Sequence, residues 1–119
     1  MIIRQGFTFE AAHRLPLHRG KCFNLHGHRY RFTVSLELPI DPGTGMTLDF
    51  ADVIAVVQEN VLEAWDHRNL NDFLENPTAE NIALGIWRRL AGPLPGLTEI
   101  ELWETEDSSV IYRGESEGG

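Results

Sequence analysis

The chain has 119 residues, a formal net charge of −8, 42% hydrophobic and 24% charged residues, which fits one globular domain with a single core. The acidic balance disfavours nucleic acid or an acidic membrane surface as the main partner, because both are negatively charged. No apolar run could span a membrane and no leader pattern is evident, and the single cysteine, Cys22, fits a reducing compartment. We therefore expect one soluble, cytoplasmic domain over residues 1–119, with a disordered tail at 115–119.

Residues 2–13 are predicted to form a first strand, because apolar and polar side chains alternate along them. His13 has the same parity as Phe7 and Phe9, so its imidazole should extend the face that carries the two rings. Residues 14–25 contain the proline, glycine and asparagine typical of a loop.

A second strand is predicted over residues 26–38. His26 and His28 are two residues apart, so an extended chain directs both side chains to one face. The same face continues with Tyr30, Phe32, Val34, Leu36 and Leu38. Two imidazoles at the start of a half-buried strand suit a transition metal, most often zinc.

Half of the ten cationic residues lie in an acid-free window between residues 11 and 36: Arg14, Arg19, Lys21, Arg29 and Arg31. A local cationic stretch on an acidic chain suggests a small anionic ligand. Arg29 and Arg31 are more simply explained as the solvated face of the second strand. The remaining three flank Cys22 and the histidines, so their role stays open.

Two helices are expected after a turn at residues 40–45. The first follows apolar residues at intervals of three and four from Phe50 to Trp65 and ends near Asp66 and His67. Residues 68–76 are predicted to be a polar connection. Thr78 can cap the second helix, which Gly92 and Pro93 would end.

Two further strands are expected at residues 97–106 and 110–112. The element order is then ββααββ, which predicts an α+β domain: an antiparallel four-stranded sheet with two helices on one face.

Three histidines could share one metal ion. His13 ends the first strand, and the following loop can bring it beside His26 and His28. Three neutral imidazoles leave a fourth zinc position for water or substrate, as in catalytic sites. The simpler alternative is that each histidine only has a hydrogen-bond partner in the core or at the surface, which is our interpretation of His18.

Cys22 and the pair Asp66–His67 are further candidates for chemistry. Cys22, four residues before His26, could ligate the metal, could react as a thiolate, or could be a small buried side chain. His67 could be a general acid or base oriented by Asp66, or a cation that suits the end of a helix.

Glu104 interrupts an apolar pattern, because it shares a strand face with Ile100 and Leu102. A carboxylate on the core side must be paired, and a ligand with two N–H donors would pair it. Alternatively the strand frays there and Glu104 lies in water. Thr78 and Glu80 are explained by helix capping, although their backbone could also line a pocket.

Taken together, five motifs resemble the 6-pyruvoyl-tetrahydropterin synthase family, in particular its bacterial branch of 6-carboxy-5,6,7,8-tetrahydropterin synthases of queuosine biosynthesis. The motifs span about residues 7–114 and are Phe9-Glu-Ala-Ala-His13, Cys22-x-x-x-His26-Gly-His28, Asp66-His67-x-x-Leu70-Asn71, Asn76-Pro77-Thr78-Ala79-Glu80-Asn81, and Glu104 followed by Tyr112.

The resemblance implies a role for each matching residue. The zinc ligands would be His13, His26 and His28; Cys22 would accept a proton; Asp66 and His67 would relay protons; Glu104 would anchor the pterin ring; and Thr78 would line the pterin pocket. Ala79 lacks the hydroxyl that some relatives carry there.

The implied substrate is 7,8-dihydroneopterin triphosphate, and the products would be the 6-carboxy pterin, acetaldehyde and triphosphate. No nicotinamide is implied, and the chain has no glycine-rich dinucleotide motif. The implied fold is the tunnelling fold, in which three subunits close a barrel, two trimers form a hexamer, and active sites lie between subunits.

Other functions stay open on the residues alone. The same fold could eliminate triphosphate to give 6-pyruvoyl-tetrahydropterin, cleave the side chain toward folate, or bind pterin or metal without turnover. Cys22 argues against the folate type, where an acid takes that role, and Cys22, Asp66 and His67 together argue against a pure binder. A zinc hydrolase is disfavoured because no carboxylate adjoins the histidines in the sequence.

Overall fold

A five-stranded sheet forms the frame of the molecule. The computed structural model describes residues 1–20 and 23–115, and its strands are β1 (Ile2–His13), β2 (His26–Glu37), β3 (Arg68–Asn69), β4 (Leu97–Trp103) and β5 (Ser109–Tyr112). The strand order is β3-β1-β2-β4-β5. β1 and β2 pair antiparallel along their whole length, from Ile2 opposite Glu37 to His13 opposite His26.

The predicted sheet of four antiparallel strands needs one correction. β3 lies within the stretch predicted to be a polar connection, and it pairs with β1 in parallel through Ala11 and Ala12. Two residues are too few for an alternating pattern to appear. β3 forms because the preceding helix ends beside β1. That placement depends on tertiary packing rather than on the local sequence.

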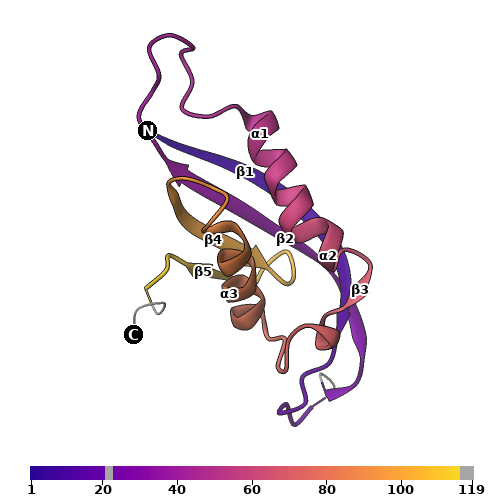
Figure 1. Ribbon diagram of the computed structural model, residues 1–119. Coiled ribbons are helices and arrows are strands. Elements are labelled where there is room, and N and C mark those ends of the chain that lie inside the picture. Colours follow the sequence, from indigo (N-terminus) through magenta and orange to yellow (C-terminus); the bar gives the residue numbers. More distant parts are fainter. Residues whose placement is uncertain (21–22, 116–119) are drawn as a thin grey trace.

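Two helices cover one face of the sheet, as predicted (Figure 1). The first is continuous through α1 (Phe50–Val57), the π-helical turn η2 (Gln58–Leu62) and α2 (Glu63–Trp65). The second is α3 (Ala79–Leu90), which packs on β4 and β5. A short 3-10 turn, η3 (Leu70–Asp72), follows β3. None of the helices in the described part of the chain is long and apolar enough to cross a bilayer.

The core lies between the helices and the sheet. Its fully buried side chains include Phe9, Tyr30, Phe32, Ile100 and Leu102 from the sheet, Val57, Val61 and Trp65 from the first helix, and Ile82, Ile86 and Leu90 from α3. The predicted apolar stripe of the first helix is narrower than expected, because Phe50 and Ile54 stay exposed. The predicted faces of β1 and β2 are confirmed: their apolar parity faces the helices, so the histidines of that parity do as well. The second half of β2 is more buried than a half-buried strand, because Thr33 and Ser35 of the polar parity are also buried.

Candidate metal centre

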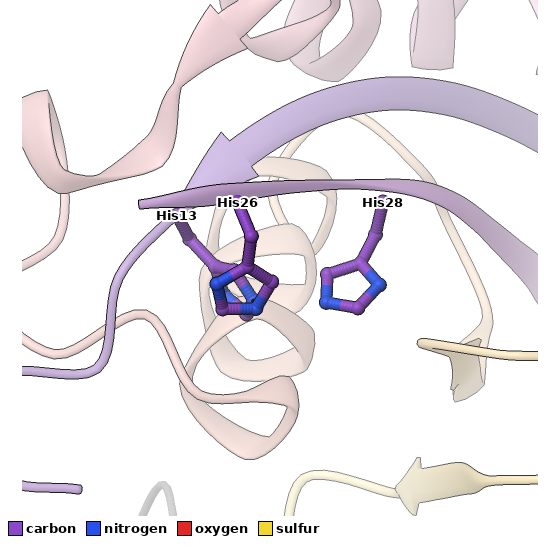
Figure 2. Close-up of side chains that lie close together, drawn as sticks. All are labelled: His13, His26 and His28. Atoms are coloured by element: carbon purple, nitrogen blue, oxygen red, sulfur yellow. The ribbon is translucent and has the colours of Figure 1, made fainter. Parts of the chain in front are cut away.

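Three imidazoles converge where β1 ends and β2 begins. His13 pairs with His26 and Ala11 pairs with His28 across the two strands, so alternation places all three histidines on the helix-covered face. Figure 2 shows their side chains projecting from the same side of the strands. His13 Nε2 lies 3.1 Å from His26 Nε2, and each histidine offers a ring nitrogen within 4.8 Å of the others.

Main-chain carbonyls orient two of the rings. His13 Nδ1 donates to the carbonyl oxygen of Pro77 at 2.7 Å, and His26 Nδ1 donates to that of Asn24 at 2.7 Å. A carbonyl accepts only, so each Nδ1 carries the proton and each Nε2 keeps a free lone pair. Such outer hydrogen bonds are the usual way in which a protein aims a histidine at a metal.

The third ring carries a buried nitrogen without a hydrogen bond. Among the described residues, His28 Nε2 has no hydrogen-bond partner, although Glu104 Oε1 lies 3.3 Å away. The ligand nitrogens of a tetrahedral zinc site are about 3.4 Å apart, given Zn–N bonds of about 2.0–2.1 Å. The orphaned nitrogen and the free lone pairs beside it fit a transition-metal ion.

The surroundings keep two of these imidazoles neutral. Burial lowers the pKa of His13 below its ordinary value of 6.5, against smaller opposing effects of the Pro77 carbonyl and the Glu104 charge. Burial likewise lowers the pKa of His28, with Glu104 opposing it. Because only a neutral imidazole ligates, these shifts favour metal binding near neutral pH.

Glu104 reaches the same site from β4. The strand ends at Trp103 rather than at residue 106 as predicted, because Glu104 N–H donates to the Ser108 carbonyl at 3.1 Å and closes a turn. β4 pairs with β2, which brings the Glu104 carboxylate to His28. Its side chain is 25% exposed, so the carboxylate is partly buried and accessible to a small ligand.

The pair Asp66–His67 is fixed to β1 through Glu10. Asp66 Oδ1 accepts a hydrogen bond from the Glu10 N–H at 2.9 Å, and His67 N–H donates to the Glu10 carbonyl at 2.6 Å. His67 has a φ of 59°, a conformation that costs a non-glycine residue energy and is frequent at functional sites. Asp66 Oδ1 lies 3.7 Å from His67 Nε2, and the imidazole is 73% exposed.

His67 lies beside the β1–β2 pair and lines an open hollow of about 550 Å³. Glu10, Ala12, Gly27 and Arg29 from the two strands also line it, and so do Ala11 and the candidate ligand His28. The structure unites His13, His26, His28 and Glu104, whereas no hydrogen bond or ion pair among the described residues joins Asp66 or His67 to the three histidines.

Other predicted residues have simpler surroundings. Thr78 is the N-cap of α3, as predicted, and its Oγ1 accepts from the Asn81 N–H at 3.2 Å; its pterin-pocket role stays a prediction. His18 accepts from the Gly20 N–H within its own loop at 2.9 Å. Cys22 lies outside the described residues, so its predicted roles also stay predictions.

Sequence reasoning missed the groups that orient the ligands. Pro77 and Asn24 act through main-chain carbonyls, which leave no signature in the side-chain pattern. The Asn-Pro-Thr segment was recognised as the start of a helix and as part of a family motif, but not as a contact of His13. Its proximity to His13 depends on how α3 packs against the sheet.

The family model described as 6-pyruvoyl tetrahydropterin synthase matches residues 2–115. The chain belongs to this family. Among its relatives, the 6-carboxy-5,6,7,8-tetrahydropterin synthase of Synechocystis is 44% identical, over 93% of this chain and 92% of that protein. The human 6-pyruvoyl tetrahydrobiopterin synthase is 36% identical, over 95% of this chain and 91% of that protein.

A solved structure agrees with this assignment. The 6-pyruvoyl tetrahydropterin synthase of Caenorhabditis elegans superimposes with a TM-score of 0.87 at 30% identity, covering 96% of this chain and 95% of that one. The tunnelling fold expected from the sequence motifs is thereby confirmed, with β3 as an addition to the four predicted strands. The named relatives of this family are pterin synthases.

Proposed function

We propose that this protein is a zinc-dependent 6-carboxy-5,6,7,8-tetrahydropterin synthase, a carbon–carbon lyase of queuosine biosynthesis. It would convert 7,8-dihydroneopterin triphosphate and water to 6-carboxy-5,6,7,8-tetrahydropterin, acetaldehyde and triphosphate. The observation that carries the proposal is the convergence of three metal-ligating histidines with Glu104. The 44% identity to the Synechocystis enzyme of that name supports the choice of reaction.

His13, His26 and His28 would hold the zinc ion. When bound, zinc supplies Lewis-acid chemistry, which polarises the side-chain oxygens of the substrate and acidifies their protons. The protein contributes neutral imidazoles, since burial lowers the pKa of His13 and His28. It also contributes the ring orientations imposed by Pro77 and Asn24.

Glu104 would bind the pterin. A carboxylate accepts two hydrogen bonds side by side, which matches the adjacent amino and ring N–H groups of a pterin. Its position beside His28 supports a binding mode in which the ring is held next to the ion and the hydroxylated side chain lies over it. This role for Glu104 differs from a structural salt bridge, because its carboxylate must remain available to the substrate.

Proton transfers would fall to Cys22 and His67. Cys22 would accept a proton from the substrate side chain, and His67, oriented by Asp66, would return one. The electrons lost by the side-chain carbon during cleavage would reduce the pterin ring, so no external reductant is needed. The triphosphate would leave as an anion, and the cationic residues of the 14–25 loop would bind it.

A complete active site would be assembled from two chains. Within one protomer, no hydrogen bond or ion pair among the described residues joins Asp66 or His67 to the candidate metal ligands, and the hollow that His67 lines is open to solvent. In a homo-oligomer, a trimer or a hexamer, His67 of one chain would meet the metal centre of another. Closing the sheet edges between chains would also protect their unpaired main-chain groups.

The product of the zinc-loaded protein tests the proposal. Purified protein is incubated with 7,8-dihydroneopterin triphosphate, pterins are identified by mass spectrometry, and acetaldehyde is trapped as a hydrazone. Carboxy product and acetaldehyde in equal amounts are expected. Unchanged substrate would contradict an enzymatic function and favour a pterin- or metal-binding protein.

A second candidate is 6-pyruvoyl-tetrahydropterin synthase. The observation in its favour is the 36% identity to the human enzyme across 95% of the chain. Both reactions begin on the same substrate and use the same residues, so the product assay separates them. A pyruvoyl product without acetaldehyde would select this candidate.

A further inference from the structure

The side chain of Asn71 clamps the main chain directly after a metal ligand. The Arg14 N–H donates to Asn71 Oδ1 at 2.8 Å, and Asn71 Nδ2 donates to the Arg14 carbonyl at 3.0 Å. The amide therefore satisfies both main-chain groups of one residue, as a paired strand would. Arg14 is the residue that follows His13.

This clamp lies where the sheet stops supporting β1. The pair His13–His26 is the last between β1 and β2, so no strand pairing within the described residues supports Arg14 on that side. Without Asn71, the main-chain groups of Arg14 would bond to water, and the peptide after His13 could rotate. The His13 imidazole would then rotate with it, although its Nε2 must stay 3.1 Å from that of His26.

Asn71 is itself held firmly. Its N–H donates to Asn69 Oδ1 at 3.0 Å, which closes the turn at η3. Asn69, in β3, pairs with Ala12 of β1. Ala12 is the residue directly before His13. The clamp is thus built on a turn that is already hydrogen-bonded to β1, and it can restrain His13 without contacting the imidazole.

We propose that Asn71 is a positioning residue for the metal ligand His13. The proposal rests on the metal centre of the proposed function and adds to it a residue outside the ligand set. Asn71 acts through the main chain at Arg14, while Pro77 restrains the ring itself. Loss of a group that bonds a metal-bound histidine directly weakens metal binding about 10- to 100-fold. Asn71 acts one step further out, so its loss is expected near the lower end of that range.

The competing explanation is that Asn71 only stabilises the fold, and Asn60 offers a matched control. Asn60 is also half-buried, and its Nδ2 donates to the Val56 carbonyl at 2.8 Å in the first helix. Asn71→Leu and Asn60→Leu each replace an amide by an apolar group of similar shape. Each substitution removes a side-chain hydrogen bond to a carbonyl. Only the first removes a clamp next to a metal ligand.

Metal affinity distinguishes the two explanations. Full-length protein is stripped of metal, Zn²⁺ and Co²⁺ affinities are measured by competition with a chelator, and the Co²⁺ absorption spectrum is recorded. We expect Asn71→Leu to weaken both affinities by about 10-fold or more and to change the spectrum. Asn60→Leu should keep the metal affinity within about twofold of wild type, even where its melting temperature falls as much as that of Asn71→Leu.

Wild-type affinity and spectrum in Asn71→Leu would overturn the proposal. If Asn71→Leu does not fold, Asn69→Ala is used instead, because removing the acceptor of the Asn71 N–H loosens the clamp. Unchanged metal affinity in Asn69→Ala would also overturn the proposal. Failure of the wild-type protein to bind either metal would remove the metal centre and this inference together. A wild-type protein that binds metal but makes no pterin product would contradict only the proposed function, because the affinity comparison needs no turnover.

Discussion

Main-chain carbonyls orient two imidazoles of the candidate metal centre, and the third imidazole lies beside a carboxylate. Pro77 and Asn24 hold the Nδ1 atoms of His13 and His26, and the buried Nε2 of His28 lies beside Glu104. A metal bond to His28 Nε2 would remove the energetic penalty of a buried polar atom that lacks a partner. The candidate ligands were evident from spacing, whereas these orienting contacts were not.

Replacing His28 by alanine should abolish tight metal binding. A site with two ligands binds zinc far more weakly than one with three, so we expect a loss of at least about 100-fold. Bound zinc per chain after dialysis measures this. His18→Ala is the control, because His18 only accepts a hydrogen bond within its loop. Equal zinc content in wild type and His28→Ala would show that the ion binds elsewhere.

The metal-free protein should become less stable as the pH falls from about 7 to 5. Burial lowers the pKa of His13 and His28 below the 6.5 of the unfolded chain. In this range the unfolded chain therefore binds more protons than the native state, and the free energy of unfolding decreases with falling pH. Urea unfolding at several pH values measures the slope. A His28→Asn variant should have a shallower slope, and a slope equal to that of wild type would contradict this origin.

Among the elements, the long ones were predictable and the short ones were not. Twelve alternating residues in β1 and again in β2 predict both strand and face, whereas the register between the two strands comes from the structure. β3 has two residues, and its strand character comes from the neighbouring β1. The π-helical turn η2 also has no simple sequence signal, although it carries the chain to Trp65 and hence to Asp66 and His67.

The packing of α3 against the first helix depends on a glycine. A Cβ atom added at Gly85 would lie 2.6 Å from Cη2 of the buried Trp65 ring. Gly85→Ala should therefore destabilise the protein by about 1–3 kcal/mol through overpacking, measured by denaturant unfolding. Gly92→Ala is the matched control, because a Cβ there meets nothing within 4 Å. Similar effects of the two substitutions would mean that the helices adjust without cost.

On the scale of the whole molecule, the two halves of the proposed chemistry are joined by no hydrogen bond or ion pair between described residues of one chain. Oligomerisation would be part of catalysis if each active site took its metal from one chain and His67 from another. This prediction can be tested without knowing the size of the oligomer.

Mixed oligomers should regain activity from two inactive variants. His26→Ala removes a metal ligand and His67→Ala removes the proton relay, so neither protein alone should turn over. With random mixing, about a quarter of the inter-chain sites would combine an intact metal centre with an intact His67. Product formation by the co-assembled variants measures this. No activity above that of the separate variants would indicate active sites within single chains.

The sequence by itself determined the strand faces, the helix cap Thr78, the three histidines and the family motifs, because these depend on local periodicity and spacing. Only the tertiary structure decided that Glu104 reaches His28, that Pro77 and Asn71 brace His13, and that His67 lines a hollow beside the β1–β2 pair. Those relations join residues about 55 to 75 positions apart, and their geometry comes from strand pairing and helix packing. No local pattern encodes the direction in which two such distant side chains meet.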